Sequence, residues 1–468
     1  MSVDSRPSEP PSVGGAKQAR PPLRWSDAIL ALRIRNFRLF WFGQLVSGIG
    51  TWMQTVALAW LVVEQTHSPV ALGTITMLQF LPILLFSLPA GVVADRIPKR
   101  RLMIGAQTLA ALQALALGVL VAVGWTPLWA LGVLAFVLGL TMAFNNPAQQ
   151  AFVSEMVEPS MVPGAIALNS AQFNGARMLG SALGGVAVAQ FGVAFVFFVN
   201  ATSFTAALGA LAAMRARELH SPKPRPRQPK ALRDGFGYAL HTPPVLFVLV
   251  CLAVVGTVGF NWPVALPLIA TDVLGVQAVG FGLLFAAFGV GSLAAAVALT
   301  YTRAPSERRL AGSGVALAVL LVLLGVSHSY AATAALMVLA GVSGTMFTTT
   351  ANTRLQLIVP DQLRGRIMSM FVLLMGGSTP IGSYVLGYLA ATLGISHSMV
   401  VFGVVCALGV FAAVSYRSMH PTAEGDGAVG TGPPHAPSPD LAAALRPGPP
   451  SPGEDAAPAG SRPQEGQP

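Results

Sequence analysis

The amino-acid sequence predicts an all-α membrane protein, with twelve transmembrane helices in two six-helix bundles between disordered terminal tails. Three observations predict this fold class. Hydrophobic residues make up 53% of the 468 residues and charged residues only 10%, whereas soluble domains carry about a quarter charged residues. The apolar residues form runs of about 20, the length that a helix needs to cross roughly 30 Å of hydrocarbon. The basic residues alternate between successive loops.

The apolar runs are expected to be helices, because a segment in lipid must satisfy its own backbone hydrogen bonds. The polar–apolar alternation typical of membrane barrel strands is absent. To within a few residues at each end, the twelve runs are 39–63, 70–93, 102–123, 128–149, 162–189, 193–214, 245–270, 279–299, 310–326, 331–350, 367–393 and 398–416.

The polar segments divide the chain into parts. The first 36 residues are rich in Pro and Arg, so no cleavable signal peptide is expected. Residues 215–235 are basic and proline-rich, and we expect neither a helix nor a folded domain there. After residue 420 the composition is typical of disorder. The predicted parts are a cytoplasmic N-terminal tail (1–36), an N-terminal bundle (37–214), a cytoplasmic basic linker (215–243), a C-terminal bundle (244–416) and a disordered cytoplasmic tail (417–468).

The basic residues indicate the orientation of the helices, because Lys and Arg accumulate in cytoplasmic loops. Alternate loops and the two tails contain 27 of the 28 Lys and Arg residues, and the intervening loops contain none. We therefore expect a multi-pass plasma (inner) membrane protein with both termini in the cytoplasm. Since this topology explains the net charge of +10, no nucleic-acid partner is expected. The exception is Arg177, in the middle of the fifth run.

Enzyme signatures are absent from the sequence. A phosphate-binding P-loop needs Gly immediately before its Lys, but every lysine follows Ala or Pro. No spacing of Cys, His or carboxylates suggests a metal site. We therefore expect a protein that is not an enzyme and that carries no cofactor and no metal.

The turn after the second helix, GVVADRIPKRR from Gly91 to Arg101, is the sharpest motif. Its cations fit a cytoplasmic anchor, and a lone Asp among them is suited to accept hydrogen bonds from a helix N-terminus. Here the chain resembles the major facilitator superfamily, whose pattern at this place is Gly-x-x-x-Asp-Arg-x-Gly-Arg/Lys-Arg/Lys. Pro98 replaces the second Gly, and the matching residues are Gly91, Asp95, Arg96, Lys99 and Arg100.

The resemblance implies a latch on the cytoplasmic side. In that family the Asp docks on the start of helix eleven, which places the partner segment at Arg364, Gly365 and Arg366. The equivalent turn before helix nine has Arg308 and Arg309 but no Asp at the matching position, so this second latch is expected to be degenerate. A Pro followed five residues later by a Gly enters helices five and eleven alike, which supports a duplicated six-helix unit.

Helix five carries the pattern ARMLGSALGG, in which Gly180, Ser181, Gly184 and Gly185 form a small-residue seam. Such a seam permits close helix packing. It also resembles the antiporter motif Gly-x-x-x-Gly-Pro-x-x-Gly-Gly of drug exporters, with Ala176 in place of the first Gly and Ser181 in place of Pro. This partial match favours export.

Arg177 lies within the same segment and is costly in a membrane, by about 2.5 to 3.5 kcal/mol on insertion scales. It must face protein or water. Two interpretations remain open: the guanidinium bonds to neighbouring carbonyls or to an acid such as Glu155, or it contacts the substrate or takes part in coupling.

Uncharged polar side chains are concentrated in a few of the helices. In the family that the chain resembles, helices one, four, seven and ten line the central cavity, so these side chains predict an amphiphilic pocket for an organic molecule. The alternative is that they bond across helices. Together with Arg177, the candidates are Gln44, Gln54, Gln79, Asn145, Asn146, Asn261, Trp262, Thr349 and Asn352.

Several separated segments are similar to the enterobactin-exporter and macrolide-efflux branch of the superfamily, namely RNFRLFWFGQLVSGIGTWM, PVALPLIATDVLG and VPDQLRGRIMSM. This resemblance implies proton-driven export of a small hydrophobic or amphiphilic molecule, such as a siderophore, macrolide or drug, by alternating access. The partners implied are this substrate, protons and the lipid bilayer, with the protein acting as a monomer. Because no run contains a central carboxylate, proton coupling follows from the resemblance alone. A lipid or nutrient importer of the same fold and a non-transporting sensor remain alternatives.

Overall fold

The computed structural model describes residues 30–219, 231–300 and 305–420, and these residues form helices joined by short turns, with no strand among them. Eleven of the helices in this part of the chain are long and apolar enough to cross a membrane. One of them has 52 residues and is broken at Gly192, where φ is 80° and ψ is 169°. Since 52 residues at about 1.5 Å each exceed twice the hydrocarbon thickness, this helix makes two crossings. The predicted fold class of twelve transmembrane helices is confirmed.

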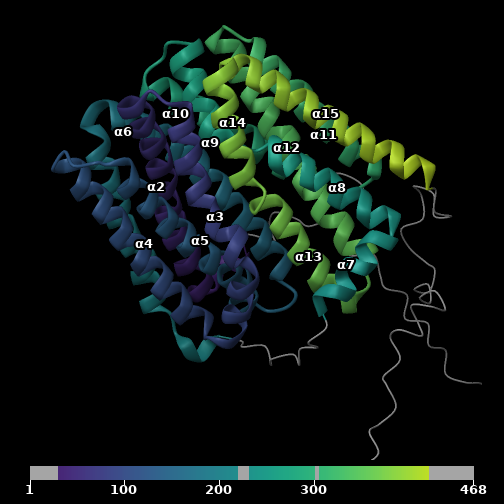
Figure 1. Cartoon of the computed structure of the whole chain (residues 1–468). Helices are drawn as coiled ribbons and strands as arrows, with labels where there is room; N and C mark the ends of the chain where they lie inside the picture. The colour runs from purple at the N-terminus through teal and green to yellow at the C-terminus, as the bar shows by residue number, and fades with distance from the viewer. Residues whose placement is uncertain (1–29, 220–230, 301–304, 421–468) are drawn as a thin grey trace, which may run out of the picture. The chain divides into compact units, whose positions relative to one another are not determined.

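The helices of the first half lie together in Figure 1, coloured purple to blue. Within this half α6 packs against α2 and α4, and α5 packs against α3 and α4. Ser68 begins α3 by accepting a hydrogen bond from the Ala71 backbone N–H, and Pro69 fits the first turn because its missing N–H is not needed there. After the short 3₁₀ helix η1 (Ala31–Arg33), the helices are α2 (Arg35–Thr66), α3 (Pro69–Arg96), α4 (Lys99–Ala122), α5 (Leu128–Met156) and α6 (Val162–Ala213).

The second half, teal to yellow in Figure 1, has its own packing, with α10 against α12, α11 against α15 and α12, and α8 against α15 and α13. Its elements are η2 (Ala216–Glu218), α7 (Ala231–His241), α8 (Pro243–Val258), α9 (Trp262–Leu268), the π-helical turn η3 (Ile269–Val273), α10 (Ala278–Thr300), α11 (Glu307–Val326), α12 (Tyr330–Ile358), α13 (Asp361–Gly376), α14 (Thr379–Leu393) and α15 (Ile395–Met419).

Two runs that were predicted as continuous helices are broken. The seventh divides into α8 and α9, and the eleventh divides into α13 and α14. Each second segment begins with a proline in its first turn, Pro263 and Pro380, and proline cannot donate the backbone hydrogen bond that would continue a helix. The two breaks face each other, because Ser383 Oγ donates to Asn261 Oδ1 at 3.1 Å. Broken helices in transporters supply polar groups at mid-membrane depth.

The expectation that residues 215–235 contain no helix was wrong at the C-terminal end of this segment. Helix α7 begins at Ala231, two residues after Pro229, and it packs against α8 and α13. Its Ala239 is buried, whereas Phe236 and Leu240 are exposed. Apolar residues at helical spacing therefore form an amphipathic helix. The predicted disordered tails fall mainly on residues 1–29 and 421–468, and these, like residues 220–230 of the linker, lie outside the described residues.

The two ends of the helices differ in charge. We call the end at which Arg35, Lys99 and Arg354 lie the basic end, and the other end the opposite end. Helix α3 runs from the opposite end at Pro69 to the basic end at Arg96. The loops at the opposite end contain no Lys or Arg.

The halves contact each other mainly through two helix pairs, α6 with α10 and α3 with α14. In each pair two glycines meet near the opposite end. A Cβ built on Gly282 would lie 2.8 Å from the Cα of Gly185, and one built on Gly73 would lie 3.1 Å from the Cα of Gly387. Only glycine permits such an approach of two backbones. We call these contacts the glycine crossings.

Packing between α6 and α10 continues inward from its glycine crossing. A Cβ on Gly289 would meet the Cα of Met178 at 2.8 Å, about half-way along the first part of α6. Nearer the basic end, Gly91, Gly175 and Gly365 have no atom of another helix within 4 Å of the position of a Cβ. The halves are therefore in tight contact from the opposite end to mid-depth.

Candidate functional site

The turn after α3 is tied to its own half by the side chains that follow it. Lys99 Nζ lies 2.6 Å from Glu155 Oε1, and both side chains are largely buried at the ends of α4 and α5. The next residue, Arg100, donates from Nε to Leu211 O at 2.7 Å and from Nη2 to Ala212 O at 3.0 Å. These carbonyls end α6 and have no partner within the helix. Lys99 and Arg100 of the motif therefore stabilise the helix ends of the first half at the basic end.

The geometry of Arg100 leads to a prediction that differs from the family pattern, in which Arg and Lys are interchangeable. Lysine cannot supply two parallel N–H groups to adjacent carbonyls, so Arg100→Lys is expected to lower stability by about 1 to 2 kcal/mol. The measurement is the thermal unfolding midpoint of the purified protein in detergent. The neighbouring Arg101 is exposed, so Arg101→Lys is the matched control, and equal midpoints for the two variants would contradict the capping role.

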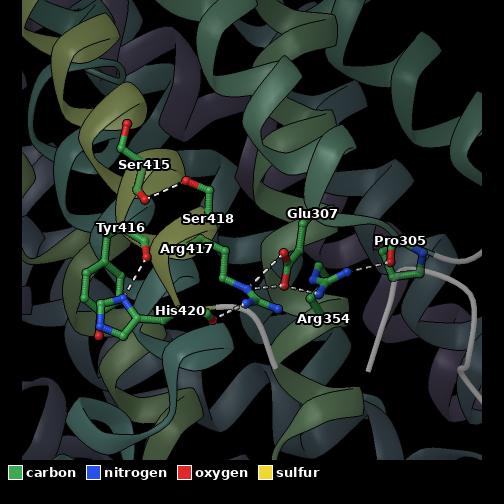
Figure 2. Close-up of polar contacts among 8 residues, drawn as sticks. All are labelled: Pro305, Glu307, Arg354, Ser415, Tyr416, Arg417, Ser418 and His420. Atoms are coloured by element: carbon green, nitrogen blue, oxygen red, sulfur yellow. Dashed lines mark hydrogen bonds and ion pairs between the residues drawn. The ribbon is translucent and has the colours of Figure 1, made fainter. Parts of the chain in front are cut away.

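The second half has a corresponding cluster at the starts and ends of its helices, shown in Figure 2. The carboxylate of Glu307, at the start of α11, lies between two guanidinium groups. Arg354 Nη2, near the end of α12, lies 2.8 Å from Oε1, and Arg417 Nε, near the end of α15, lies 3.1 Å from the carboxylate. Arg354 also donates to Pro305 O at 3.3 Å and Arg417 to His420 O at 2.7 Å. We call Glu307, Arg354 and Arg417 the Glu307 cluster.

Sequence reasoning missed the Glu307 cluster. The turn before α11 has no Asp at the position equivalent to Asp95, and its carboxylate is instead that of Glu307. The available signal was an acid at the first position of a helix, at the same membrane level as Arg354 and Arg417. The ion pair joins residues 110 apart in the chain, and sequence spacing alone does not indicate such a contact.

The predicted latch is not tested by these contacts. The Asp95 side chain lies outside the part that the structure describes, and Arg96 is exposed. On the other side, Arg364 and Arg366 are half-buried and Gly365 is exposed near the start of α13. The latch stays a prediction for a state in which the halves meet at the basic end.

Two of the predicted cavity residues belong to polar ladders inside the first half. Gln54 is fully buried, donates to Gln113 Oε1 at 3.1 Å and accepts from Asn200 Nδ2 at 2.7 Å. Gln44 accepts from Gln107 Nε2 at 3.4 Å, and its backbone carbonyl accepts from Gln172 Nε2 at 3.0 Å. These ladders connect α2 with α4 and α6. Gln79 is also buried, on α3.

The other uncharged candidates differ in exposure. Asn145 is half-buried and bonds to Gln149 Oε1 at 3.4 Å, and Asn146 is exposed. Thr349 is exposed, and Asn352 is half-buried and accepts from Gln356 Nε2. In the second half, Asn261 is buried at the break between α8 and α9 and donates to Thr257 O at 2.6 Å. Trp262 follows it and is buried as well.

The seam in α6 has two faces. Cβ atoms on Gly180 and Gly184 would meet the backbone of α2, at Ile49 O and the Cα of Met53. One on Gly185 would meet α10, at Ala278 O. Ser181 is fully buried between them. One face of the motif therefore packs α6 against α2 of its own half, and the adjacent face packs it against α10 of the other half.

Arg177 lies half-way along the first part of α6, in an aromatic surrounding. Its Cζ lies 4.7 Å from the ring centroid of Phe288, 5.7 Å from that of Trp52 and 5.8 Å from that of Phe173. Aromatic rings at such distances attract a cation, and the interaction contributes about 2 kcal/mol where water is excluded. Phe288 belongs to α10 of the other half, so this contact bridges the halves just inside their tight packing.

The hydrogen bonding of Arg177 excludes one of its two predicted partners. Its Nη2 donates to Asn174 Oδ1 at 2.6 Å, whereas Glu155 pairs with Lys99. The expectation of a Glu155 partner was therefore wrong, because α4 places a lysine beside that acid. Asn174 carries no charge, so the guanidinium is compensated by ring quadrupoles and one amide oxygen.

Relatives agree with this architecture. A family model described as transmembrane secretion effector matches residues 26–449. The chain is 24% identical over 386 residues to the staphyloferrin A transporter of Staphylococcus aureus, covering 80% of this chain and 95% of the relative. It is 26% identical over 372 residues to the multidrug efflux pump Tap of Mycolicibacterium fortuitum, covering 76% of this chain and 90% of the relative. A shorter segment is similar to macrolide efflux protein A of Streptococcus pyogenes. It is 30% identical over 128 residues, which cover 27% of this chain and 30% of that protein.

Solved structures share the fold at low identity. The POT family transporter PepTSo has a TM-score of 0.68 at 13% identity, covering 83% of this chain and 99% of that chain. A bacterial homolog of the human lysosomal transporter Spinster has a TM-score of 0.65 at 16% identity, covering 84% and 98%. The matched family and the relatives are transporters and not enzymes. The chain therefore belongs to the transmembrane secretion effector family of the major facilitator superfamily.

Proposed function

We propose that this protein exports a small amphiphilic organic molecule from the cytoplasm by alternating access, driven by a proton gradient. The observation that carries the proposal is the distribution of contacts between the halves. The two glycine crossings close the opposite end, while Gly91, Gly175 and Gly365 have open space toward the basic end. A transporter that rocks two halves about a central site needs such a state to load its substrate.

The distribution of charge supports the proposed orientation. The basic end faces the cytoplasm of the plasma membrane, because basic loops are retained on that side, and both termini lie there. The state seen here is then closed to the outside and able to take up cargo from the cytoplasm. The efflux names of the relatives support the direction of transport. The protein is proposed to act as a monomer.

The side chains where the halves meet support the proposed substrate class. Phe173, which is 53% exposed, and the half-buried Trp52 provide apolar surface next to the charged Arg177. An amphiphilic molecule would contact both kinds of group, whereas a fully polar nutrient would gain nothing from the exposed aromatic surface. The proton part of the proposal rests on the family, since Arg177 is the one charged residue at the centre of the spans.

Inside-out membrane vesicles test the proposal. With the cytoplasmic face outward, vesicles energised by NADH acidify inside, and we expect them to accumulate 1-pyrenebutyrate only when they contain the protein. Addition of a protonophore is expected to release the accumulated compound. Uptake by right-side-out vesicles instead would indicate an importer, and no protein-dependent uptake in either orientation would indicate a sensor.

A further inference from the structure

Two hydrogen-bond donors without a partner lie against the same aromatic ring. Arg177 Cζ is 4.7 Å from the ring centroid of Phe288, and the indole ring of Trp262 is 5.3 Å from it. Among the described residues, neither Arg177 Nε nor Trp262 Nε1 has a hydrogen-bond partner. Trp262 is only 4% exposed, so water does not readily satisfy its N–H. Buried donors are rarely left unmet in folded proteins.

The chemistry of the two groups identifies what is missing. A guanidinium and an indole N–H donate hydrogen bonds and cannot accept them. A ligand atom that satisfies either group must therefore be an acceptor, and beside a full positive charge an anionic oxygen binds more strongly than a neutral one. In the described part of the chain no carboxylate lies within ion-pair distance of Arg177.

The surroundings of the two donors fit the remainder of an amphiphile. Trp52 lies 6.0 Å from Phe173 and 5.8 Å from Phe285, ring centroid to ring centroid. Phe173 is 53% exposed although it lies beside Arg177. An apolar body placed against these rings would cover exposed aromatic surface while its head group reached the donors.

We propose that Arg177 and Trp262 bind the anionic, carboxylate-type head of the transported molecule. Arg177 belongs to α6 of the first half, and Trp262 begins α9 of the second. A head group held by both therefore connects the two halves next to the inner end of their tight packing. The proposal rests on the proposed function for the statement that the bound molecule is cargo. The binding of an anion can be measured without transport.

Three pyrene probes that differ only in their head group test the proposal. The full-length protein in lipid nanodiscs is titrated with 1-pyrenebutyrate, 1-pyrenebutanol and 1-pyrenebutyl-trimethylammonium, and energy transfer from tryptophan to pyrene is corrected with empty nanodiscs. We expect the wild type to bind the carboxylate about tenfold more tightly than the alcohol, and the ammonium probe most weakly.

Substitutions assign the preference to the two donors. Arg177→Gln is expected to lower the affinity for the carboxylate about tenfold or more and to leave the affinity for the alcohol unchanged. Trp262→Phe keeps a ring against Phe288 and removes only the N–H, so it is expected to weaken the carboxylate alone, by a smaller factor. Arg177→Lys should retain part of the preference. Arg101→Gln removes an exposed guanidinium at the basic end and is the control for loss of charge.

Three results would overturn the proposal. One is equal binding of the carboxylate and the alcohol by the wild type. Another is an unchanged carboxylate preference in Arg177→Gln with both probes bound. The third is an equal loss of affinity for both probes in Arg177→Gln, which a purely structural Arg177 predicts. Selective binding without vesicle accumulation would retain this inference and reject the exporter.

Discussion

Replacement of Gly282 by leucine is expected to abolish most transport while the protein still folds. A Cβ at this position would lie 2.6 Å from Ser181 O and 2.8 Å from the Cα of Gly185, both backbone atoms that cannot turn aside. Closure at the opposite end would therefore be blocked. Overpacking of this kind costs about 1 to 3 kcal/mol, and a free energy of this size shifts an equilibrium between two states about five- to 150-fold.

The second glycine crossing provides an independent test of whether close glycine packing is needed to close the opposite end. Gly387→Val would place its Cβ 2.6 Å from Pro69 O, on the other pair of helices. Both variants are expected to favour the state that is open at the opposite end. Transport is measured in vesicles, normalised to the amount of folded protein.

The conformational shift can be measured by thiol labelling. Cys251 and Cys406 are first replaced by Ala, and a reporter cysteine then replaces Ala278, which is 3% exposed. In the Gly387→Val background, labelling by a membrane-impermeant maleimide from the opposite end is expected to rise several-fold. Controls are Gly209→Leu and Gly312→Leu, which have no atom within 4 Å of the Cβ position and should transport normally. Normal transport by Gly282→Leu would show that the crossing is dispensable.

The number and order of the helices could be predicted from the sequence because hydrocarbon thickness sets the length of every span. The breaks at Pro263 and Pro380 were missed, although each proline lies inside an apolar run. Hydropathy measures only the transfer of side chains into lipid and does not register a missing backbone donor. Helix α7 was missed because the basic and proline-rich composition of the segment suggested no helix. Its eleven residues nevertheless have apolar positions at helical spacing.

The candidate site was predictable in part. Arg177 was identifiable from its cost in the membrane, but its rings were not, because Phe288 follows it by more than 100 residues and belongs to the other half. Gln44 and Gln54 were selected as cavity residues because they are polar and lie on helix one. Their bonds to Gln107 and Gln113 depend on which face of α2 meets α4, and local sequence does not determine this.

The two halves use the same positions at the basic end with opposite charges. In the first half the cation, Lys99, starts a helix and the anion, Glu155, ends the next one. In the second half the anion, Glu307, starts the helix and the cation, Arg354, ends the next. The two halves can exchange the two charges because the energy of an ion pair depends on the product of the charges and is unchanged by the exchange. The exchange explains why a search for a repeated sequence motif found only one of the two sites.

Neutralising Glu307 is expected to destabilise the second half strongly. Glu307→Gln would remove the carboxylate that both Arg354 and Arg417 contact, in a cluster whose three side chains are no more than 18% exposed. Breaking a buried ion pair costs about 3 to 5 kcal/mol, and the residual exposure places the expected loss near the lower value. The thermal unfolding midpoint in detergent should fall by several degrees.

A matched control and a double variant distinguish this effect from a general loss of charge. Glu218→Gln makes the same chemical change in the exposed pair with Arg215, whose side chains are 46% and 65% exposed, and it should leave the midpoint unchanged. Arg417→Gln combined with Glu307→Gln removes the repulsion as well as the attraction, so it should be less destabilising than the two single losses together. Additive losses would instead show that Glu307 and Arg417 act independently.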